Sequence, residues 1–588
     1  MLSACIAIVC AQSEKSFADP VFLDQGPEWS ASLRDDFYTR DQGSRLMPLA
    51  WFRSLRRGDG SSFLPDGMTR YGYLSNAHSP SGLPVGFHAS GPTGLEVVGM
   101  TCAACHTRQI TVNGAAFRID GGPALVDFQS FMSDVDEAFG RALATNDAFA
   151  EFAKAALGKS APTAAETTNL RAQVDRWYRR FHVLMSKALP KQPWGLGRLD
   201  AVGMIFNRLT GLDLGPEPDR IIADNIKLAD APVRYPFLWN AARQDQTQWP
   251  GFADNGSDVL GLARNMGEVL GVFGLYAPKR DGLLINFLNG ASANFDGLSK
   301  LEDLIKRIGP PKWQWALDAQ LVADGRKIFE RAPEAGGCKG CHDVQAGAMR
   351  FPFVQTWATP IQNVGTDTRE YGLLEWKADT GALRGAFIPL ATDPLQPTDL
   401  DINILATSVI GSIAQHVLVG QPTADTNLVA SVKLNKPQGA LKIQTPAPLP
   451  PELQDLTGAF GKSIEHIQTQ SEKGQFTAQG VKPPTTKGAY ESRVLQGIWA
   501  AAPYLHNGSV ATLADLLQPA AARATSFNIG PEYDIANVGI ATHQQSSYIR
   551  KTTDCSDLNS GDSRCGHEFG VTLSDSEKKA LLEYLKSL

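Results

Sequence analysis

The chain has 588 residues, of which 43% are hydrophobic and 20% are charged, and its formal net charge at pH 7 is −6. This length predicts more than one hydrophobic core, and the composition is ordinary for a soluble globular protein. The negative charge argues against a nucleic-acid partner. No stretch beyond the N-terminus approaches the run of about eighteen apolar residues that a transmembrane helix needs, so we expect no internal membrane span.

The N-terminal residues have the pattern of an export signal. Residues 1–11 are apolar and are followed by polar residues, which resembles the hydrophobic part of a secretory signal without its basic start. We therefore expect residues 1–19 to be a signal segment and the protein to be periplasmic or secreted. The four residues that end at Cys5 also have the pattern of a lipoprotein cleavage box, which would require a start upstream; we favour a cleaved signal without a lipid.

Residues 20–90 are rich in Gly, Pro, Ser and aromatic residues. This composition predicts loops and short elements, which we interpret as an extension that wraps around the body of the protein. Farther along, residues 134–158 and 164–189 have apolar residues at helical spacing, which predicts two helices.

The motif C-x-x-C-H occurs twice, at Cys102, Cys105 and His106 and again at Cys338, Cys341 and His342. It is the attachment signature of a c-type haem, in which two thiols bond to the porphyrin and the adjacent His binds the iron. The alternatives are a zinc knuckle and a thioredoxin-like dithiol. Zinc would need a second CxxC or HxxxH nearby to complete four ligands, and neither motif has one. We therefore expect two covalently bound haems c.

The two motifs lie much farther apart than the length of a small cytochrome c domain, about a hundred residues. We therefore expect two haem domains, residues 91–319 with a helical insertion and residues 320–588 with an insertion marked by Pro-rich segments at 446–451 and 483–484. The expected fold class is mainly α: two cytochrome c-type haem domains with long loop-rich additions and few strands.

The second haem domain has a predicted helix near each end. Residues 322–330 predict a short helix before the second motif, and residues 574–588 predict a terminal helix that begins with a capping box of Ser574 and Glu577. We expect the two helices to pack together and close the domain.

The sixth ligand of each iron decides whether a haem transfers electrons or binds a small molecule. The last Met, Met349, follows His342 too closely to reach the opposite face of that haem, so we expect a second His as its ligand. The candidates are His416, His466, His506, His543 and His567. We favour His567, in a Gly-rich loop that a disulfide between Cys555 and Cys565 would tether in an oxidising compartment. His506, in a turn sequence, is the next candidate and could instead line the haem edge.

The first haem has a different set of nearby candidates. They are His182, Met132, Met185, Met204 and Met266, and none lies in a Gly/Pro-rich loop of the kind that presents a ligand. His182 and Met185 share an apolar helical pattern that is simplest to interpret as core packing. The sequence therefore favours a first haem with one side open.

Residues 493–517, which include Arg493 and His506, resemble the C-terminal signature of the bacterial di-haem cytochrome c peroxidase superfamily. The length and the segments 36–52, 118–122, 235–239 with 248–249, and 264–273 are more similar to its rubber oxygenase branch, secreted di-haem enzymes that cleave polyisoprene with O₂. The resemblance covers most of residues 27–588. It implies a mostly helical fold, a reactive N-terminal haem with His106 as its proximal ligand, and a C-terminal bis-His haem as electron relay. It also implies His567 as the second ligand of that haem and a calcium ion between the domains, whose ligands we do not assign.

The resemblance implies a di-haem oxidoreductase that activates peroxide or O₂ at the N-terminal haem. The alternatives are a rubber-oxygenase-like dioxygenase that cleaves polyisoprene or another unsaturated hydrocarbon, and a non-catalytic electron-transfer cytochrome. The partners would be H₂O₂ or O₂ with a small redox cytochrome as donor, or a hydrophobic polymer. A gas sensor is a further class, but the sequence has no recognisable signalling output.

Two residue types are candidates for catalytic roles. A peroxidase needs an acid/base group over the open iron, and Glu268 is the only carboxylate in the apolar segment 264–273; the alternative is a Glu paired with a neighbouring Arg such as Arg264. Trp239 and Trp249 could line the pocket or carry a radical between the haems, and core packing is the default for each.

Overall fold

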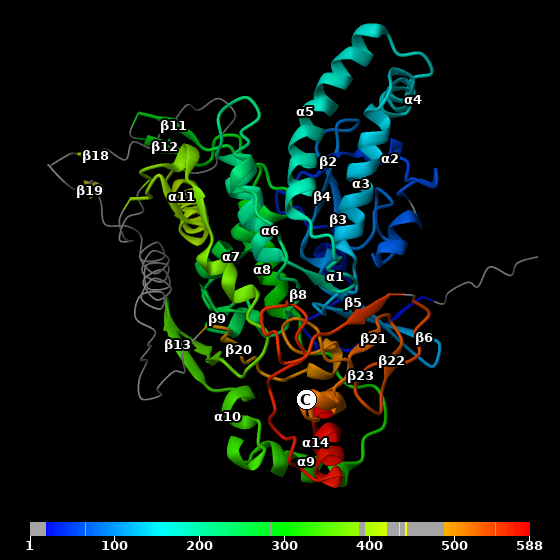
Figure 1. Cartoon of the computed structure of the whole chain (residues 1–588), viewed down its shortest axis with the longest axis vertical. Helices are drawn as coiled ribbons and strands as arrows, with labels where there is room; N and C mark the ends of the chain where they lie inside the picture. Colours follow the sequence, from blue (N-terminus) through cyan, green and yellow to red (C-terminus); the bar gives the residue numbers. More distant parts are fainter. Residues whose placement is uncertain are drawn as a thin grey trace, which may run out of the picture.

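The computed structural model describes residues 19–64, 66–282, 284–386, 394–419, 434–435, 442–443, 487–546 and 548–588. Most of the expected signal segment, His466 and the Pro-rich segments of the insertion lie outside the described residues. The molecule is elongated, with helices α4 and α5 at one end and helices α9 and α14 at the other (Figure 1). None of the described helices is long and apolar enough to cross a membrane.

The N-terminal extension adds a strand to each of two small sheets next to the first motif. Strand β1 (Val21–Phe22) pairs in parallel with β6 (Ala115–Asp120), which pairs antiparallel with β5 (Thr107–Val112). Strand β2 (Met47–Pro48) joins β4 (Val97–Met100), which pairs with β3 (Phe87–Ser90). Because β4 ends just before Cys102 and β5 begins just after His106, the first motif is held between the two sheets.

The extension also contains helices α1 (Ala31–Thr39) and α2 (Leu49–Ser54). Asp120, at the end of β6, binds side chains in and just before α1. Its fully buried carboxylate accepts hydrogen bonds from Trp29 Nε1 at 2.8 Å, Tyr38 Oη at 2.6 Å and Arg34 Nε at 2.6 Å. One buried carboxylate therefore satisfies three side chains of the extension.

We expect Asp120→Ala to lower the free energy of unfolding by about 3–5 kcal/mol, because the substitution leaves the Arg34 guanidinium without its buried partner. Asp35→Ala is the matched control: Asp35 lies on α1, next to Arg34, and pairs with His78 on the surface, where an ion pair contributes about 0–1 kcal/mol. Chemical denaturation of both variants measures the difference. Equal stabilities would contradict the role of Asp120.

The helical insertion consists of α3 (Phe128–Leu143), α4 (Asn146–Leu157) and α5 (Ala164–Ala188), with α4 and α5 projecting from one end of the molecule (Figure 1). The prediction of one helix over 134–158 is wrong, because the chain turns at Thr145, whose side chain accepts from the backbone N–H of Ala148 and starts a new helix. Aromatic residues pack the helices together; Phe139 and Trp177 have ring centroids 4.5 Å apart.

Helices α6 (Ala201–Arg208), α7 (Asp258–Gly271), α8 (Phe295–Arg307) and α11 (Asp401–Val419) form the central bundle (Figure 1). Helix α7 packs against α6, α8 and α11. Its buried face, which includes Leu260, Met266 and Leu270, belongs to one apolar core with residues of α8 and α11.

The C-terminal region contains α9 (Ala319–Phe329), α10 (Lys339–His342), α13 (Leu513–Leu516) and α14 (Asp575–Ser587). The predicted terminal helix and its capping box are confirmed: Ser574 and Glu577 each bond to the backbone of the other. Helix α14 packs on α9, as expected. The approach is close at Gly325, where a Cβ would lie 2.0 Å from the carbonyl oxygen of Ala580.

We expected few strands, whereas the described residues contain many, each two to six residues long and most in isolated pairs. The remaining strands are β7 (Arg198–Leu199), β8 (Val233–Arg234), β9 (Gln246–Thr247), β10 (Ala253–Asp254), β11 (Lys279–Asp281), β12 (Leu284–Asn286), β13 (Ala346–Arg350), β14 (Val354–Trp357), β15 (Ile361–Gln362), β16 (Lys377–Asp379), β17 (Thr398–Leu400), β18 (Leu434–Asn435), β19 (Lys442–Ile443), β20 (Tyr490–Glu491), β21 (Ser526–Asn528), β22 (Tyr533–Asp534), β23 (Gly539–Ile540) and β24 (Ile549–Lys551). Such short pairs stiffen loops, and the sequence pattern of two or three residues is too weak to predict them.

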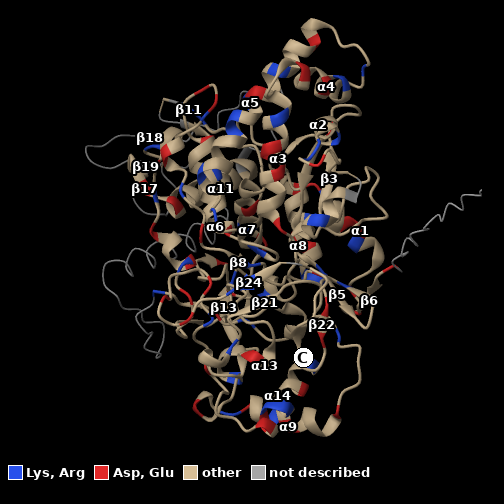
Figure 2. Ribbon diagram, turned by 45° about the vertical axis from the view of Figure 1, so that its right-hand side comes forward, with Lys and Arg blue, Asp and Glu red and all other residues tan. Residues whose placement is uncertain are grey.

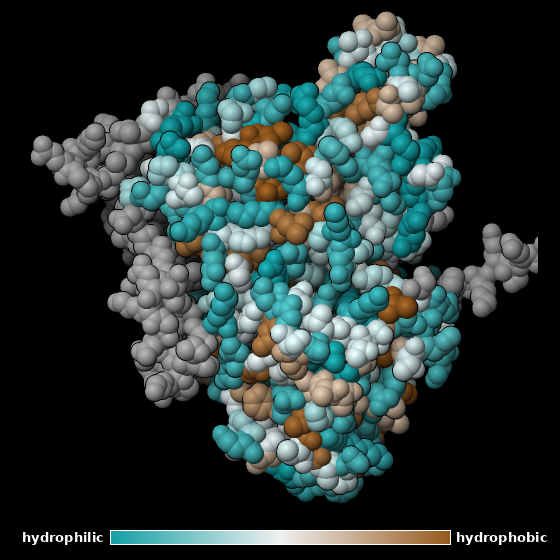
Figure 3. Space-filling model, in the orientation of Figure 1, coloured by the Kyte–Doolittle hydropathy of each residue, from teal (hydrophilic) through white to brown (hydrophobic). Residues whose placement is uncertain are grey.

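The charged residues are distributed over the whole molecule. Lys and Arg are interspersed with Asp and Glu over the ribbon (Figure 2). The face seen in Figure 3 is mostly hydrophilic with small hydrophobic patches.

Candidate haem sites

The first C-x-x-C-H motif forms a tight turn. Cys102–Ala104 is a single 3₁₀ turn, and the backbone N–H of His106 donates to the carbonyl of Cys102 at 3.0 Å. Gly86 allows the extension to lie against this turn, because a Cβ there would be 1.9 Å from the backbone nitrogen of Ala104. Cys102 and Cys105 are not bridged to each other, so both thiols are available for thioether bonds.

His106 is oriented by a carbonyl far away in the sequence. Its Nδ1 lies 2.9 Å from the carbonyl oxygen of Pro236. Because that oxygen can only accept, Nδ1 carries the proton and Nε2 keeps its lone pair for a metal. Burial lowers the pKa of His106 to about 4, so the ring is in the neutral form that metals bind.

The second motif repeats this arrangement. His342 closes α10, its backbone N–H donates to the carbonyl of Cys338 at 3.0 Å, and its Nδ1 lies 2.8 Å from the carbonyl oxygen of Arg493. Cys338 and Cys341 are also unbridged. Each motif therefore presents two free thiols and one imidazole whose Nε2 is free to coordinate, which is the donor set that haem c requires.

Cavities lie beside both motifs. The first is mostly apolar and is lined by Cys102, Cys105 and His106 together with Tyr235, Phe237, Gln248, Arg264, Glu268 and Phe273.

Of the candidate sixth ligands of the first haem, Met204, on α6, also lines this cavity, whereas Met132, Met185 and Met266 are buried in the helical cores. His182 is half exposed on α5 and pairs with Asp136 at 2.9 Å.

Glu268 lies on α7 and lines the first cavity. Burial raises its pKa, and the side chains of Arg264 and Gln248 act in the opposite direction. The ion pair of Arg264 is made with Glu302 of α8, and both of those side chains are buried. Glu302 was missed in the sequence because nothing in the pattern of α8 distinguishes it from a surface carboxylate.

The second cavity contains His342 and His567, together with Cys338 and Cys341. The centroids of the two imidazole rings are 6.0 Å apart. Two imidazole nitrogens, each about 2 Å from one metal ion, would place the ring centroids about 6 Å apart. Burial lowers the pKa of His567 to about 3, so this ring is also neutral. The spacing and the protonation state therefore fit an iron between the two rings.

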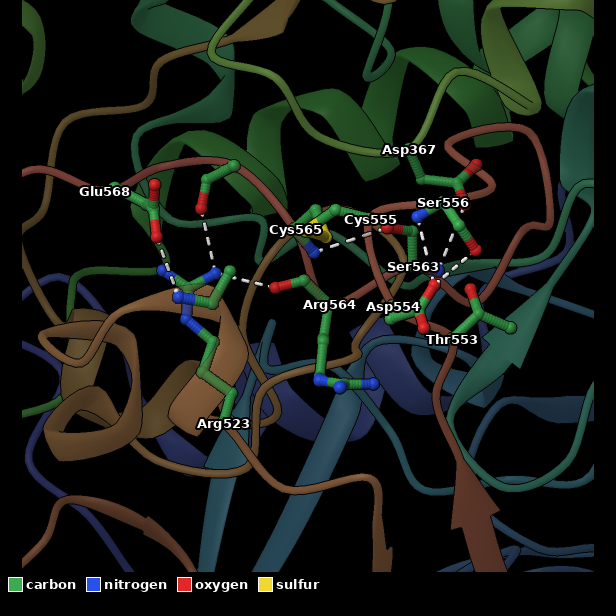
Figure 4. Close-up of a disulfide and its surroundings, with 12 residues drawn as sticks. Asp367, Arg523, Thr553, Asp554, Cys555, Ser556, Ser563, Arg564, Cys565 and Glu568 are labelled. Atoms are coloured by element: carbon green, nitrogen blue, oxygen red, sulfur yellow. Dashed lines mark hydrogen bonds between the residues drawn. A yellow bond between two sulfur atoms is a disulfide. The ribbon is translucent and has the colours of Figure 1, made fainter.

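The His567 loop is held by several bonds (Figure 4). The predicted disulfide between Cys555 and Cys565 is present. Arg523 donates to the carbonyls of Arg564 at 2.7 Å and Gly566 at 2.8 Å. His567 has a positive φ of 51°, and its backbone N–H donates to the carbonyl of Val364 at 2.9 Å.

His506 lines the same cavity but is packed among aromatic rings. It stacks on Tyr490 with centroids 3.7 Å apart, and Trp249 lies 6.4 Å away. Trp249, a candidate for lining the pocket or carrying a radical between the haems, lines the second cavity with His506, whereas Glu268 lines the first. His416 stacks on Phe295 and His543 is exposed on the surface.

The two cavities share a wall. Phe237, Glu491 and Arg493 line both of them. Backbone carbonyls at this wall orient both histidines. The carbonyl of Pro236, next to Phe237, contacts His106 Nδ1, and the carbonyl of Arg493 contacts His342 Nδ1. These carbonyl contacts could not be read from the sequence, which carries no signal for a backbone acceptor.

The expected calcium ion has no assigned site. Within the part of the chain that the structure describes, no group of three or more His, Cys, Asp or Glu side chains is arranged to hold a metal ion. Calcium therefore stays a prediction from the family resemblance.

Residues 489–528 match the family model of RoxA-like, cytochrome c-like domains. The matched segment contains Glu491, Arg493 and His506, which line the second cavity. The match supports a relationship to the rubber-oxygenase-like di-haem cytochromes and implies covalently bound haem c, which is consistent with an oxidoreductase.

Two relatives come from Sinorhizobium fredii. The uncharacterized protein y4iJ is 29% identical to this chain over 95% of the chain and 92% of its own length. The uncharacterized protein y4iM is 48% identical over 10% of this chain and 13% of its own length. The first relative therefore shares the long form of the chain.

Proposed function

We propose that this protein is a di-haem c-type cytochrome oxidoreductase that activates peroxide or O₂ at the N-terminal motif and relays electrons through the C-terminal motif. The difference between the two cavities carries the proposal. A second imidazole faces His342 at 6.0 Å, whereas a carboxylate, Glu268, lines the cavity of His106. The first motif would therefore keep an open position, and the second would have two His ligands, His342 and His567.

Haem bound at the two motifs would supply one iron that takes the oxidant and one that exchanges electrons. The residues of the chain then have separate roles. The Pro236 carbonyl orients His106, the apolar lining excludes water, and Glu268 holds a proton that it can deliver to an oxygen atom of the bound oxidant. Burial favours the protonated form of Glu268.

We expect Glu268→Gln to slow turnover with H₂O₂ and a reduced small cytochrome by roughly 10²–10⁴-fold, the effect typical of a lost general acid/base. Asp258→Asn is the matched control, because Asp258 lies on the same helix with its side chain in solvent. Stopped-flow absorption measures both rates. A Glu268→Gln variant that contains both haems and turns over at the wild-type rate would exclude this role.

The second candidate is a rubber-oxygenase-like dioxygenase. The RoxA-like match and the apolar lining of the first cavity favour it. Such an enzyme would consume O₂ and release carbonyl-bearing fragments from polyisoprene or another unsaturated hydrocarbon without added electrons. Oxygen uptake with a polyisoprene latex, compared with the peroxidase assay, separates the two activities, and a protein inactive in both would leave an electron-transfer cytochrome.

The proposed cofactors also indicate where the protein works. Haem c is attached outside the bacterial cytoplasm, so we propose a periplasmic or secreted protein. Its partners would be a small redox cytochrome for a peroxidase or a hydrophobic polymer for an oxygenase.

A further inference from the structure

Two buried arginines, Arg234 and Arg493, lie at the wall between the cavities. Arg234, on β8, is 5% exposed and lines the second cavity, and Arg493 is 6% exposed and lines both. Each guanidinium lies over an aromatic ring: Arg234 is 4.7 Å from the ring centre of Trp249, and Arg493 is 4.0 Å from that of Phe237. These contacts fix the orientation of both guanidinium groups.

Both guanidinium groups keep donors without an acceptor. Arg234 uses Nε on the carbonyl of Leu505 at 2.9 Å, and Arg493 uses Nη2 on Gln244 Oε1 at 2.8 Å. Nη1 of Arg234, and both Nε and Nη1 of Arg493, are buried with no hydrogen-bond partner among the described residues. Most buried guanidinium nitrogens have an acceptor, so these three nitrogens without a partner indicate a missing acceptor.

The charges in the wall are also out of balance. Glu491 is the carboxylate paired with Arg493, with Oε1 lying 3.5 Å from Nε, and no ion pair of Arg234 is found in the described chain. Burying an ion without a partner costs several kcal/mol. A ligand that brings a carboxylate into the second cavity would supply both the missing acceptor and the missing charge.

We propose that Arg234 and Arg493 bind a propionate carboxylate of the C-terminal haem. The second cavity is chosen because Arg234 lines that cavity and Arg493 lines both. A carboxylate has two oxygens, and it could accept one charge-assisted N–H bond from each of the two guanidinium groups. The inference rests on the proposed function in one respect, the presence of haem c at Cys338, Cys341 and His342.

In this proposal Arg493 is a positioning residue that contacts the C-terminal haem site twice, once through its backbone and once through its side chain. Its backbone carbonyl orients His342, and its side chain would hold the propionate. The two positive charges also favour the reduced form of the nearby iron, because reduction lowers the net charge of the iron centre. Loss of either charge should therefore lower the reduction potential of the bis-His haem.

We expect Arg234→Gln and Arg493→Gln each to shift the ferric–ferrous equilibrium constant of the bis-His haem about tenfold toward ferric, which is 59 mV for one electron. Spectroelectrochemistry of the full-length di-haem protein measures it, and resonance Raman spectra should show shifted propionate bending bands. Arg550→Gln is the matched control: Arg550 is fully buried and lines neither cavity, and its Nη1 and Nη2 donate to the carbonyls of Gly508 and Leu196, so that only its Nε is without a partner.

Wild-type potentials and propionate bands in both Gln variants would overturn the inference, as would an equal shift in Arg550→Gln. If a Gln variant does not fold, Arg234→Lys and Arg493→Lys serve instead: they keep the charge and lose the guanidinium donors. The Lys variants should move the propionate bands and change the equilibrium constant less than threefold, and unchanged bands would again overturn the inference. Failure of the proposed function would appear in the wild type, as a protein inactive with peroxide and O₂, and would leave this comparison intact.

Discussion

Replacing Cys102 and Cys105 by Ala should remove one haem from the protein, and replacing Cys338 and Cys341 should remove the other. Each pair of thiols is unbridged and lies next to an imidazole whose Nδ1 is held by a carbonyl. Thioether bonds survive denaturation, so mass spectrometry of the denatured wild type should find the polypeptide plus two haems. Each double variant should carry one haem.

The variant that lacks Cys555 and Cys565 is the control for this experiment. Those two residues form a disulfide, so their loss should leave both haems attached. A Cys102/Cys105 variant that retains two covalently bound haems would contradict the assignment of the first motif.

We expect His567→Ala to convert the C-terminal haem from low spin to high spin. The physical reason is the loss of the imidazole that lies 6.0 Å, centroid to centroid, from His342. Electron paramagnetic resonance of the ferric protein distinguishes the two states. The effect should be all-or-none for this haem, because no other described imidazole has its ring against that of His342.

His506→Ala is the matched control, since His506 lines the same cavity but stacks on Tyr490. We expect it to keep the low-spin signal. A folded His567→Ala variant with an unchanged low-spin signal, together with a high-spin His506→Ala variant, would assign the ligand to His506 instead.

The local features of both sites could be predicted from the sequence. Thioether attachment depends on two thiols and a His within five residues, so Cys102 and Cys338 could be recognised without a fold. The capping box of α14 is equally local, since Ser574 and Glu577 are three residues apart. Such features depend on short-range geometry, which the sequence encodes directly.

The contacts that orient the two histidines could not be predicted. His106 and Pro236, like His342 and Arg493, are more than a hundred residues apart, and any residue can supply a backbone carbonyl. The pairing of Arg264 with Glu302 depends on how α7 packs on α8. Trp249 was a candidate for lining the pocket or carrying a radical between the haems; its place in the second cavity depends on the short pairs β9–β10 and β15–β20, which the sequence does not reveal.

The break between α3 and α4 shows the limit of periodicity. Apolar residues continue at helical spacing across residues 134–158. This spacing alone does not reveal the turn between α3 and α4. Thr145 begins the second helix by capping it, and a Thr is a common residue inside helices as well. Helix existence was therefore predicted and the boundary was not.

Titration of the fully reduced protein with CO is the measurement that tests the account most directly. The account requires one haem with an open position, beside His106, and one closed by His342 and His567. It therefore predicts that one CO binds per polypeptide chain and that the bound CO is lost in the Cys102→Ala/Cys105→Ala variant. Binding of two CO molecules, binding of none, or retention of CO by that variant would contradict the account.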